Sequence, residues 1–213
     1  MAFTIQNVCD LARTRLNDDD KSRYPDTLLE KLANEALEAM SLIAPHLFTL
    51  IGNITPTYAQ SHQDLFTGND KALALYGILA VTGGNSVLEC DYYQQVAFKR
   101  SALTQTAGVP ENWARHPADK DKQCATRYFL FPPPASGTLL AEYSATPTYV
   151  VLGSNAPVAE AYRPAMADFI VHRVLSIDDE AVAIQKASAH LAAFMTLMGA
   201  GVQTKQFAHE GTA

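Results

Sequence analysis

The chain has 213 residues, of which 48% are hydrophobic and 18% charged, and its formal net charge is −6 at pH 7. This length predicts one domain, or one domain with an insertion, and the apolar content excludes a disordered chain. Proteins that bind nucleic acid usually carry a basic face, so this acidic chain without basic runs is not expected to bind specific DNA sequences.

Three cysteines, Cys9, Cys90 and Cys124, are scattered along the chain. An odd and widely spaced set predicts neither a disulfide framework nor a zinc ribbon, and it fits a reducing compartment. The first residues lack the basic and apolar regions of a secretory signal. No run of about 18 uncharged apolar residues predicts a membrane span.

Two amphipathic helices are predicted near the N-terminus. Over residues 4–16 the apolar side chains recur every three or four positions, and Thr4 is a suitable N-cap. Pro25 begins a second helix that ends before Pro45. The acidic residues 18–20 between them lack the spacing of a calcium loop and are expected to form a solvated turn. The pair predicts an antiparallel helical hairpin.

The middle of the chain is rich in strand-forming residues. Gly83 and Gly84 favour a turn, and Asp91 is expected to cap a short helix that runs to Leu103. The loop 132–137 contains three prolines and a glycine, and predicts that the two strands around it form a hairpin. The expected strands cover residues 48–54, 58–60, 73–81, 86–89, 125–131 and 138–144.

Helical periodicity returns after residue 157. The apolar spacing predicts one helix over 162–177 and a last helix, capped by Asp178 or Asp179, that ends at Gly199 and Gly201. The polar residues 202–213 are expected to form a flexible tail.

The expected fold is therefore α+β. Two terminal helical hairpins, residues 1–45 and 158–201, are expected to close into a four-helix bundle, with a β-rich module of residues 46–157 inserted between them.

The sequence shows no specific catalytic or metal-binding motif. His172 and His190 lie on successive predicted helices, but a metal there needs further ligands, so satisfied or exposed histidines are the favoured interpretation. Cys90 precedes Asp91 without a marked base, which favours a structural thiol over a nucleophile. We therefore expect no catalytic residue, no metal site and no cofactor.

Aromatic residues provide the candidate contact sites. The aromatic runs at 92–93 and 128–131 favour core packing over stacking on bases. Trp113, the only tryptophan, lies in a predicted polar stretch, where it either pins the loop to the body or anchors a partner. Trp113 and Phe207, the one aromatic residue of the tail, are the candidate partner-interface residues.

Several segments carry a family resemblance through their shared order along residues 5–198. They are Ala-Arg-Thr-Arg-Leu-Asn-Asp-Asp-Asp at 12–20, Arg-Tyr-Pro-Asp at 23–26, Ile-Ala-Pro-His-Leu-Phe at 43–48, Pro-Glu-Asn-Trp at 110–113, Tyr-Phe-Leu-Phe-Pro-Pro-Pro at 128–134, Ala-Glu-Tyr-Ser-Ala-Thr-Pro at 141–147, and the closing helices around Asp168 and His190. In this order the chain resembles bacteriophage head–tail adaptor proteins, the connector subunits that assemble as a ring beneath the portal.

The resemblance implies a structural virion protein and not an enzyme. Such a protein would form a dodecameric ring between portal and tail, extend the DNA channel, and support tail attachment and genome retention. The implied partners are other copies of the chain, the portal protein and a tail tube or nozzle protein. Genomic DNA would pass through the lumen without sequence-specific binding, and no membrane is involved. The implied location is the neck or tail of the virion, after synthesis in the cytoplasm of the host bacterium.

General physical arguments agree with that expectation. A ring subunit needs no active site, but it needs two complementary side surfaces. An acidic lumen repels phosphates and lets DNA slide. Two alternatives remain: another phage assembly or tail-completion factor that acts as an interaction module, and a small soluble enzyme.

Overall fold

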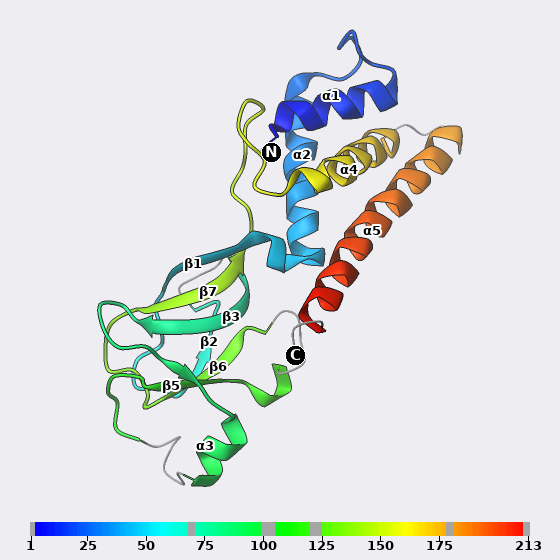
Figure 1. Cartoon of the computed structure of the whole chain (residues 1–213). Helices are drawn as coiled ribbons and strands as arrows, with labels where there is room; N and C mark the ends of the chain where they lie inside the picture. The colour runs from blue at the N-terminus through cyan, green and yellow to red at the C-terminus, as the bar shows by residue number, and fades with distance from the viewer. Residues whose placement is uncertain (1–2, 68–70, 99–104, 120–124, 178–180, 211–213) are drawn as a thin grey trace. The chain divides into compact units, whose positions relative to one another are not determined.

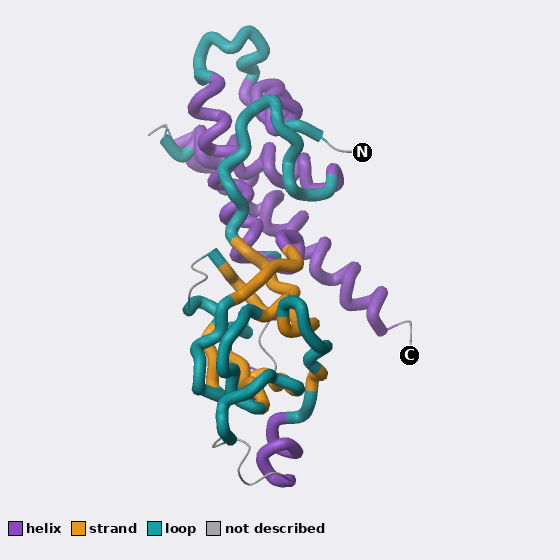
Figure 2. Tube along the Cα trace, turned by 90° about the vertical axis from the view of Figure 1, so that its left-hand side faces the viewer, coloured by secondary structure: helices purple, strands orange, loops and turns teal. Residues whose placement is uncertain are grey.

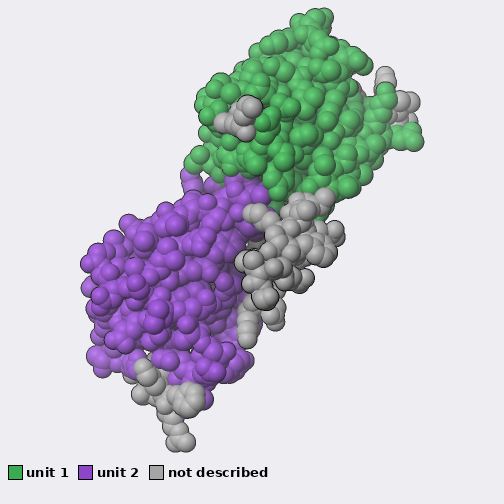
Figure 3. All heavy atoms as spheres, viewed as in Figure 1, with its two compact units in different colours: residues 1–44, 147–213 green, residues 45–146 purple. Residues whose placement is uncertain are grey.

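A computed structural model describes residues 3–67, 71–98, 105–119, 125–177 and 181–210 of the chain. The chain divides into two compact units, which Figure 3 colours separately. A helical unit comprises residues 1–44 and 147–213, and a β-rich unit comprises residues 45–146. The fold is α+β, as predicted.

The helical unit is built around one central helix, α4. Figure 1 shows α1 and α4 lying across α2, and α4 packs against α1, α2 and α5. The predicted four-helix bundle of two antiparallel hairpins is therefore not confirmed, because α1 crosses α2 instead of running alongside it. The elements are α1 (Ile5–Leu16), α2 (Asp26–Ile43), the 3-10 helix η4 (Glu160–Tyr162), α4 (Arg163–Leu175) and α5 (Ala181–Glu210).

Local signals explain the ends of the first two helices. The Thr4 hydroxyl accepts a hydrogen bond from the Asn7 N–H at 3.3 Å, and Asn7 Oδ1 accepts one from the Thr4 N–H at 2.9 Å. This reciprocal cap confirms the predicted start of α1. The helix stops at Asn17, whose φ of 52° lies in the left-handed region. As predicted, α2 begins after Pro25 and ends before Pro45.

The turn between α1 and α2 holds a buried ion pair. Asp18 is fully buried, and its Oδ2 lies 2.6 Å from Nη1 of Arg13. Its carboxylate also accepts hydrogen bonds from the backbone N–H groups of Arg23 at 2.8 Å and Tyr24 at 3.3 Å. The prediction of a solvated turn is therefore wrong for Asp18, because these donors offset the cost of burying the carboxylate.

Asp18 is expected to make the stability of the helical unit depend on pH. Burial opposes ionisation, but the N–H groups of Arg23 and Tyr24 and the guanidinium of Arg13 outweigh it and hold the pKa of Asp18 below its ordinary 3.8. A carboxyl whose pKa is lower in the folded state stabilises the fold above its unfolded pKa, and this contribution disappears as pH falls through the lowered pKa.

We therefore expect Asp18→Asn to melt at a lower temperature than the wild type near pH 7, and the gap to shrink as pH falls below about 4. Circular dichroism melts across this range measure the gap. A gap of constant size at all pH values would contradict the role assigned to the carboxylate.

Two sheets form the β-rich unit, and every named strand lies in it (Figure 2). The antiparallel first sheet has the order β1-β7-β3, and the second has the order β2-β6-β5-β4, in which β4 runs parallel to β5. The strands are β1 (Thr49–Ile54), β2 (His62–Asp64), β3 (Ala72–Val81), β4 (Leu88–Glu89), β5 (Asn112–Arg115), β6 (Arg127–Phe131) and β7 (Leu139–Ala145). The unit also contains η1 (Pro45–Phe48), α3 (Tyr92–Phe98) and η3 (Pro117–Asp119).

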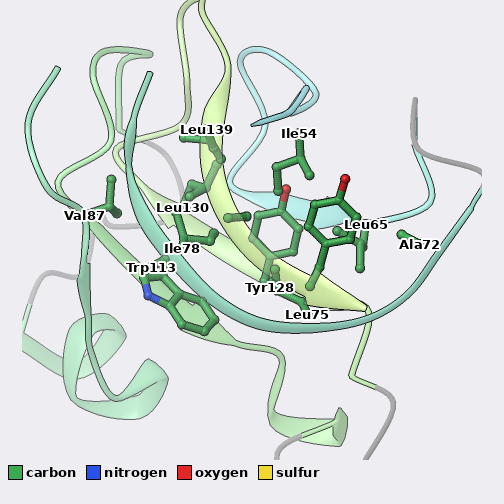
Figure 4. Close-up of a cluster of buried hydrophobic side chains, with 12 residues drawn as sticks. Ile54, Leu65, Ala72, Leu75, Ile78, Val87, Trp113, Tyr128, Leu130 and Leu139 are labelled. Carbon is green, nitrogen blue, oxygen red and sulfur yellow. The ribbon is translucent and has the colours of Figure 1, made fainter. Parts of the chain in front are cut away.

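One hydrophobic cluster joins the two sheets. Leu75 and Ile78 of β3 meet Trp113 of β5 and Leu130 of β6 in this cluster (Figure 4). Along most of β7, buried residues alternate with half-buried ones, which is the pattern of a strand with one buried face, whereas residues 128–131 of β6 are buried on both faces.

The predicted hairpin of residues 125–131 and 138–144 is wrong. The two strands exist as β6 and β7, but they belong to different sheets. Prolines 132–134 have no N–H to continue a ladder between them. Instead, the carbonyl of Pro133 accepts a hydrogen bond from Gly108 N–H, and that of Pro134 accepts one from Ala59 N–H, both at 2.8 Å.

Of two further strand predictions, one is confirmed and one is wrong. The run 73–81 is β3, and Gly83, with a φ of 73°, lies in the turn after it, as predicted. The strand predicted at 58–60 is wrong, because Ala59 has a φ of 59°, which no strand residue adopts. The neighbouring strand, β2, begins at His62.

The C-terminal part of the chain differs from the expectation in two ways. Gly199 and Gly201 do not end the last helix, because α5 continues to Glu210 through most of the segment expected to be a tail. Residues 147–157, which the sequence assigned to the β-rich module, belong to the helical unit. The predicted caps Asp178 and Asp179 lie outside the described residues.

Candidate functional site

His172 and His190 each bind the neighbouring helix and not each other. His172 Nδ1 lies 3.0 Å from the carbonyl oxygen of Ala187. His190 Nδ1 lies 2.7 Å from Oδ1 of Asp168, and the same oxygen lies 2.6 Å from Nη1 of Arg15. Asp168 thus joins α1, α4 and α5 through one carboxylate. Within the described ranges, no group of three His, Cys, Asp or Glu side chains is arranged to hold a metal ion.

The cysteines occupy different environments. Burial raises the pKa of the Cys9 thiol to about 12, which keeps it protonated at neutral pH and therefore unreactive. Cys90 is half-buried. Cys124 lies outside the described residues.

Cys90 lines a small pocket of about 330 Å³ in the β-rich unit, near the lower limit for ligand sites. Arg115 in its wall is held by the chain itself: Nη2 donates to the carbonyl of Tyr76 at 2.8 Å, and the guanidinium lies 5.9 Å from the centre of the Trp113 ring. The full lining is Glu89, Cys90, Asp91, Tyr92, Tyr93, Arg115 and Pro117. No histidine stands among these described residues to serve as a base for the thiol.

The two candidate interface residues lie in different places. Trp113 is 2% exposed and lies in the core cluster on β5 (Figure 4). Its ring therefore pins β5 to the body of the unit, which is one of the two interpretations of the sequence, and it offers no surface to a partner in this conformation. Phe207 lies near the end of α5, and its side chain is outside the described part of the structure.

The aromatic run at 128–131 splits between the two faces of the second sheet. Tyr128 and Leu130 enter the core cluster, whereas Phe129 and Phe131 form a second cluster with Ala114. The Phe129 ring centre lies 5.3 Å from that of His62 and 4.6 Å from that of Tyr92. Phe129 is itself buried, so core packing is confirmed for the run at 128–131, whereas Tyr93 of the other aromatic run is 65% exposed.

Exposed apolar surface is the feature that the sequence analysis missed. On α5, Ala187, Phe194 and Met198 are buried, whereas Leu191 and Met195 on the same helix are exposed. A sequence signal existed, because residues 187–204 contain no Asp, Glu, Lys or Arg. A helix that is apolar on both faces is normally covered on both. Leu50 and Ile51 on β1 are also exposed.

The comparison with protein families decides the class of the protein. A family model described as SU10 adaptor protein matches residues 3–210. The chain belongs to this phage adaptor family. The resemblance drawn from the sequence motifs is therefore confirmed, and the family is one of structural phage adaptors and not an enzyme family. No curated protein matches the chain significantly.

Membership in this family indicates the partners and the location of the protein. It implies oligomerisation, interaction with portal and tail components, and a place in the neck or tail of the virion. Among the described residues, no helix is both long and apolar enough to cross a membrane. The functional sites of an adaptor are surfaces, so the exposed apolar residues of α5 and β1 are the candidates for contact.

Proposed function

We propose that this adaptor forms a closed ring of twelve copies between portal and tail. The observation that carries the proposal is the uncharged outer face of α5, where Ile184, Leu191 and Met195 are exposed at helical spacing. Large contiguous apolar patches are rare on soluble monomers and mark surfaces that a partner covers. Identical subunits that contact one another through two different surfaces close into a ring when the rotation between them allows it.

The ring would extend the DNA channel below the portal, support tail attachment and help to retain the packaged genome. The net charge of −6 supports a lumen that does not grip DNA, because acidic surfaces repel phosphates. The helical unit would supply most contacts between copies. The segment around Trp113, held by the buried ring, would face neighbouring copies or the tail tube or nozzle protein.

We infer that the end of α5, including Phe207, contacts the portal. Helix α5 packs on α4, and among the α5 residues whose side chains the structure describes, the buried ones, Ala183, Ala187, Phe194 and Met198, all precede residue 203. Deletion of residues 203–213 is therefore expected to leave the melting temperature of the helical unit within a few degrees of the wild type and to weaken binding to the cognate portal. Co-sedimentation with purified portal rings measures this binding. Unchanged binding would contradict the assignment.

Mass photometry tests the ring itself. Twelve chains of 23.1 kDa give a particle of about 277 kDa, formed by the chain alone or on the portal as a template. A chain that stays near 23.1 kDa in both samples would favour the alternative function, an interaction module that assists assembly.

A further inference from the structure

Strand β1 is an open edge of the first sheet. It pairs with β7 on one side only, and its six residues contain no charge and no proline. Ile51 is 62% exposed, and Leu50 on the opposite face is also exposed. Proteins usually protect such an edge with charged residues, proline or a covering segment, because an unprotected edge pairs with another strand.

The direction of the backbone groups in β1 follows from those in β7. Thr138, just before β7, accepts a hydrogen bond from the N–H of Thr82 through its carbonyl, and Thr146, just after β7, donates its N–H to Lys71. Thr82 and Lys71 flank β3. Successive residues of a strand direct their N–H and C=O groups to opposite edges, so the even-numbered residues of β7 face β3 and the odd-numbered ones face β1.

Odd-numbered Tyr143 of β7 is paired with Leu50 of β1, so Leu50 directs its N–H and C=O to β7. Ile51 and Asn53, at the alternate positions, direct theirs away from the sheet. Among the described residues, these outward groups have no hydrogen-bond partner.

The other long edge of the same sheet is covered. Along β3, the N–H of Val81 donates to Asn85, the carbonyl of Leu79 accepts from Val87, and the N–H of Leu75 donates to Ala125. The edge of the second sheet at β2 has three residues and carries the charge of Asp64. The open edge at β1 therefore differs from the edges at β3 and β2.

A second open edge lies in the helical unit, at residues 149–152. Side chains of α2 bind the backbone of this segment at Val150 and Leu152. Val150 donates its N–H to Oδ1 of Asn34 at 2.7 Å and accepts from Nδ2 of Asn34 at 2.9 Å. Leu152 donates its N–H to Oε2 of Glu30 at 2.9 Å and accepts from the N–H of Gln6 at 2.8 Å. Hydrogen bonds at every second residue are the pattern of a β-strand.

The backbone groups at the alternate positions, Tyr149 and Val151, face the other way, while the Tyr149 hydroxyl donates to Oε1 of Glu30 at 2.8 Å. Tyr149 is 61% exposed and Val151 is 55% exposed. The carbonyl of Val151 accepts from Ser154, but in the described part of the chain no group binds the N–H of Val151 or the N–H and C=O of Tyr149. Residues 146–152 contain no charged side chain.

We propose that β1 of one copy pairs with residues 149–151 of the next copy, which adds a strand to its β1-β7-β3 sheet. The proposal rests on the ring described above and names a contact that builds it. Both edges are uncharged, carry large apolar side chains and leave backbone groups unbonded, and main-chain pairing supplies the affinity in strand addition. The two edges differ and belong to different units, so the contact is heterologous, as a ring requires.

The Ile51→Pro variant tests the contact. Proline removes the outward N–H of Ile51 and leaves the hydrogen bonds of Leu50 to β7 in place, and edge strands tolerate proline on the solvent side. We expect Ile51→Pro to raise the concentration for half-assembly by about two- to tenfold, the effect of one lost hydrogen bond at each contact. The control Ile51→Val keeps the N–H and a β-branched side chain and is expected to assemble as the wild type does.

Hydrogen exchange of the wild-type chain provides a readout that needs no variant. Peptides spanning 49–54 and 148–152 are expected to exchange more slowly in the assembled ring than in the dissociated chain. A ring in which neither peptide gains protection, or only the β1 peptide does, would overturn the proposed pairing while the ring stands. A ring that forms equally well from Ile51→Pro would also overturn it. A wild-type chain that forms no ring, alone or with portal, would refute the proposed function and this contact with it.

Discussion

Trp113→Ala is expected to destabilise the β-rich unit by about 3–5 kcal/mol, the usual cost of removing a large aromatic side chain from a core. Trp113 is among the largest fully buried side chains described and packs with residues of both sheets. Its loss leaves a cavity between the sheets, and it also removes the ring beneath the Arg115 guanidinium. Urea denaturation followed by circular dichroism measures the change in the free energy of unfolding.

A matched control comes from the same sheet. Leu88 on β4 is exposed and lies one residue before Glu89, the partner of Trp113 in the ladder. Leu88→Ala is expected to change the free energy of unfolding by no more than about 0.5 kcal/mol. Equal effects of the two substitutions would contradict the role assigned to the tryptophan as the centre of the core.

Phe194→Ala is expected to destabilise the helical unit by about 3–5 kcal/mol. Phe194 is fully buried on α5, and its ring packs edge-on against Phe169 of α4 at 5.2 Å between centres. Along α5, Phe194 lies four residues after His190, which contacts Asp168 of α4, and four residues before the buried Met198. The measurement is urea denaturation followed by the helical circular dichroism signal.

A substitution at Met195, the residue next to Phe194, distinguishes effects on stability from effects on assembly. Met195 is 51% exposed, so Met195→Ala is expected to change the free energy of unfolding by less than about 0.5 kcal/mol. The same substitution removes apolar surface from the outer face of α5 and is expected to weaken ring formation in mass photometry. A loss of stability equal to that of Phe194→Ala would mean that the outer face of α5 is part of the core of the folded chain.

The helices were predictable because their signals are local. The Thr4 cap, Pro25 and Pro45 mark helix ends through the donors and dihedral angles of single residues. The end of α5 was not predictable in this way, because Gly199 and Gly201 lower the helix propensity only modestly and do not forbid a helix. The burial of Asp18 could not be predicted from the sequence, because it depends on the side chain of Arg13, five positions earlier, which reaches into the turn and binds the carboxylate.

The β-rich unit was predictable as a set of strands but not as two sheets. Periodicity identifies β3, β6 and β7, but strand pairing depends on contacts between distant residues, so the proline loop at 132–137 was mistaken for a hairpin. The candidate contact surfaces were also not predictable from local sequence patterns. A lone tryptophan in a polar stretch has two interpretations until its burial is known, and the open edges at β1 and 149–151 depend on hydrogen bonds that no local motif encodes.

The most direct test of the account is negative-stain electron microscopy of the chain mixed with its cognate portal. We expect a ring with a central hole, coaxial with the portal and built from twelve copies of the chain. Portal particles without added density, next to adaptor chains that remain single, would contradict the central claim that this family member forms the ring between portal and tail.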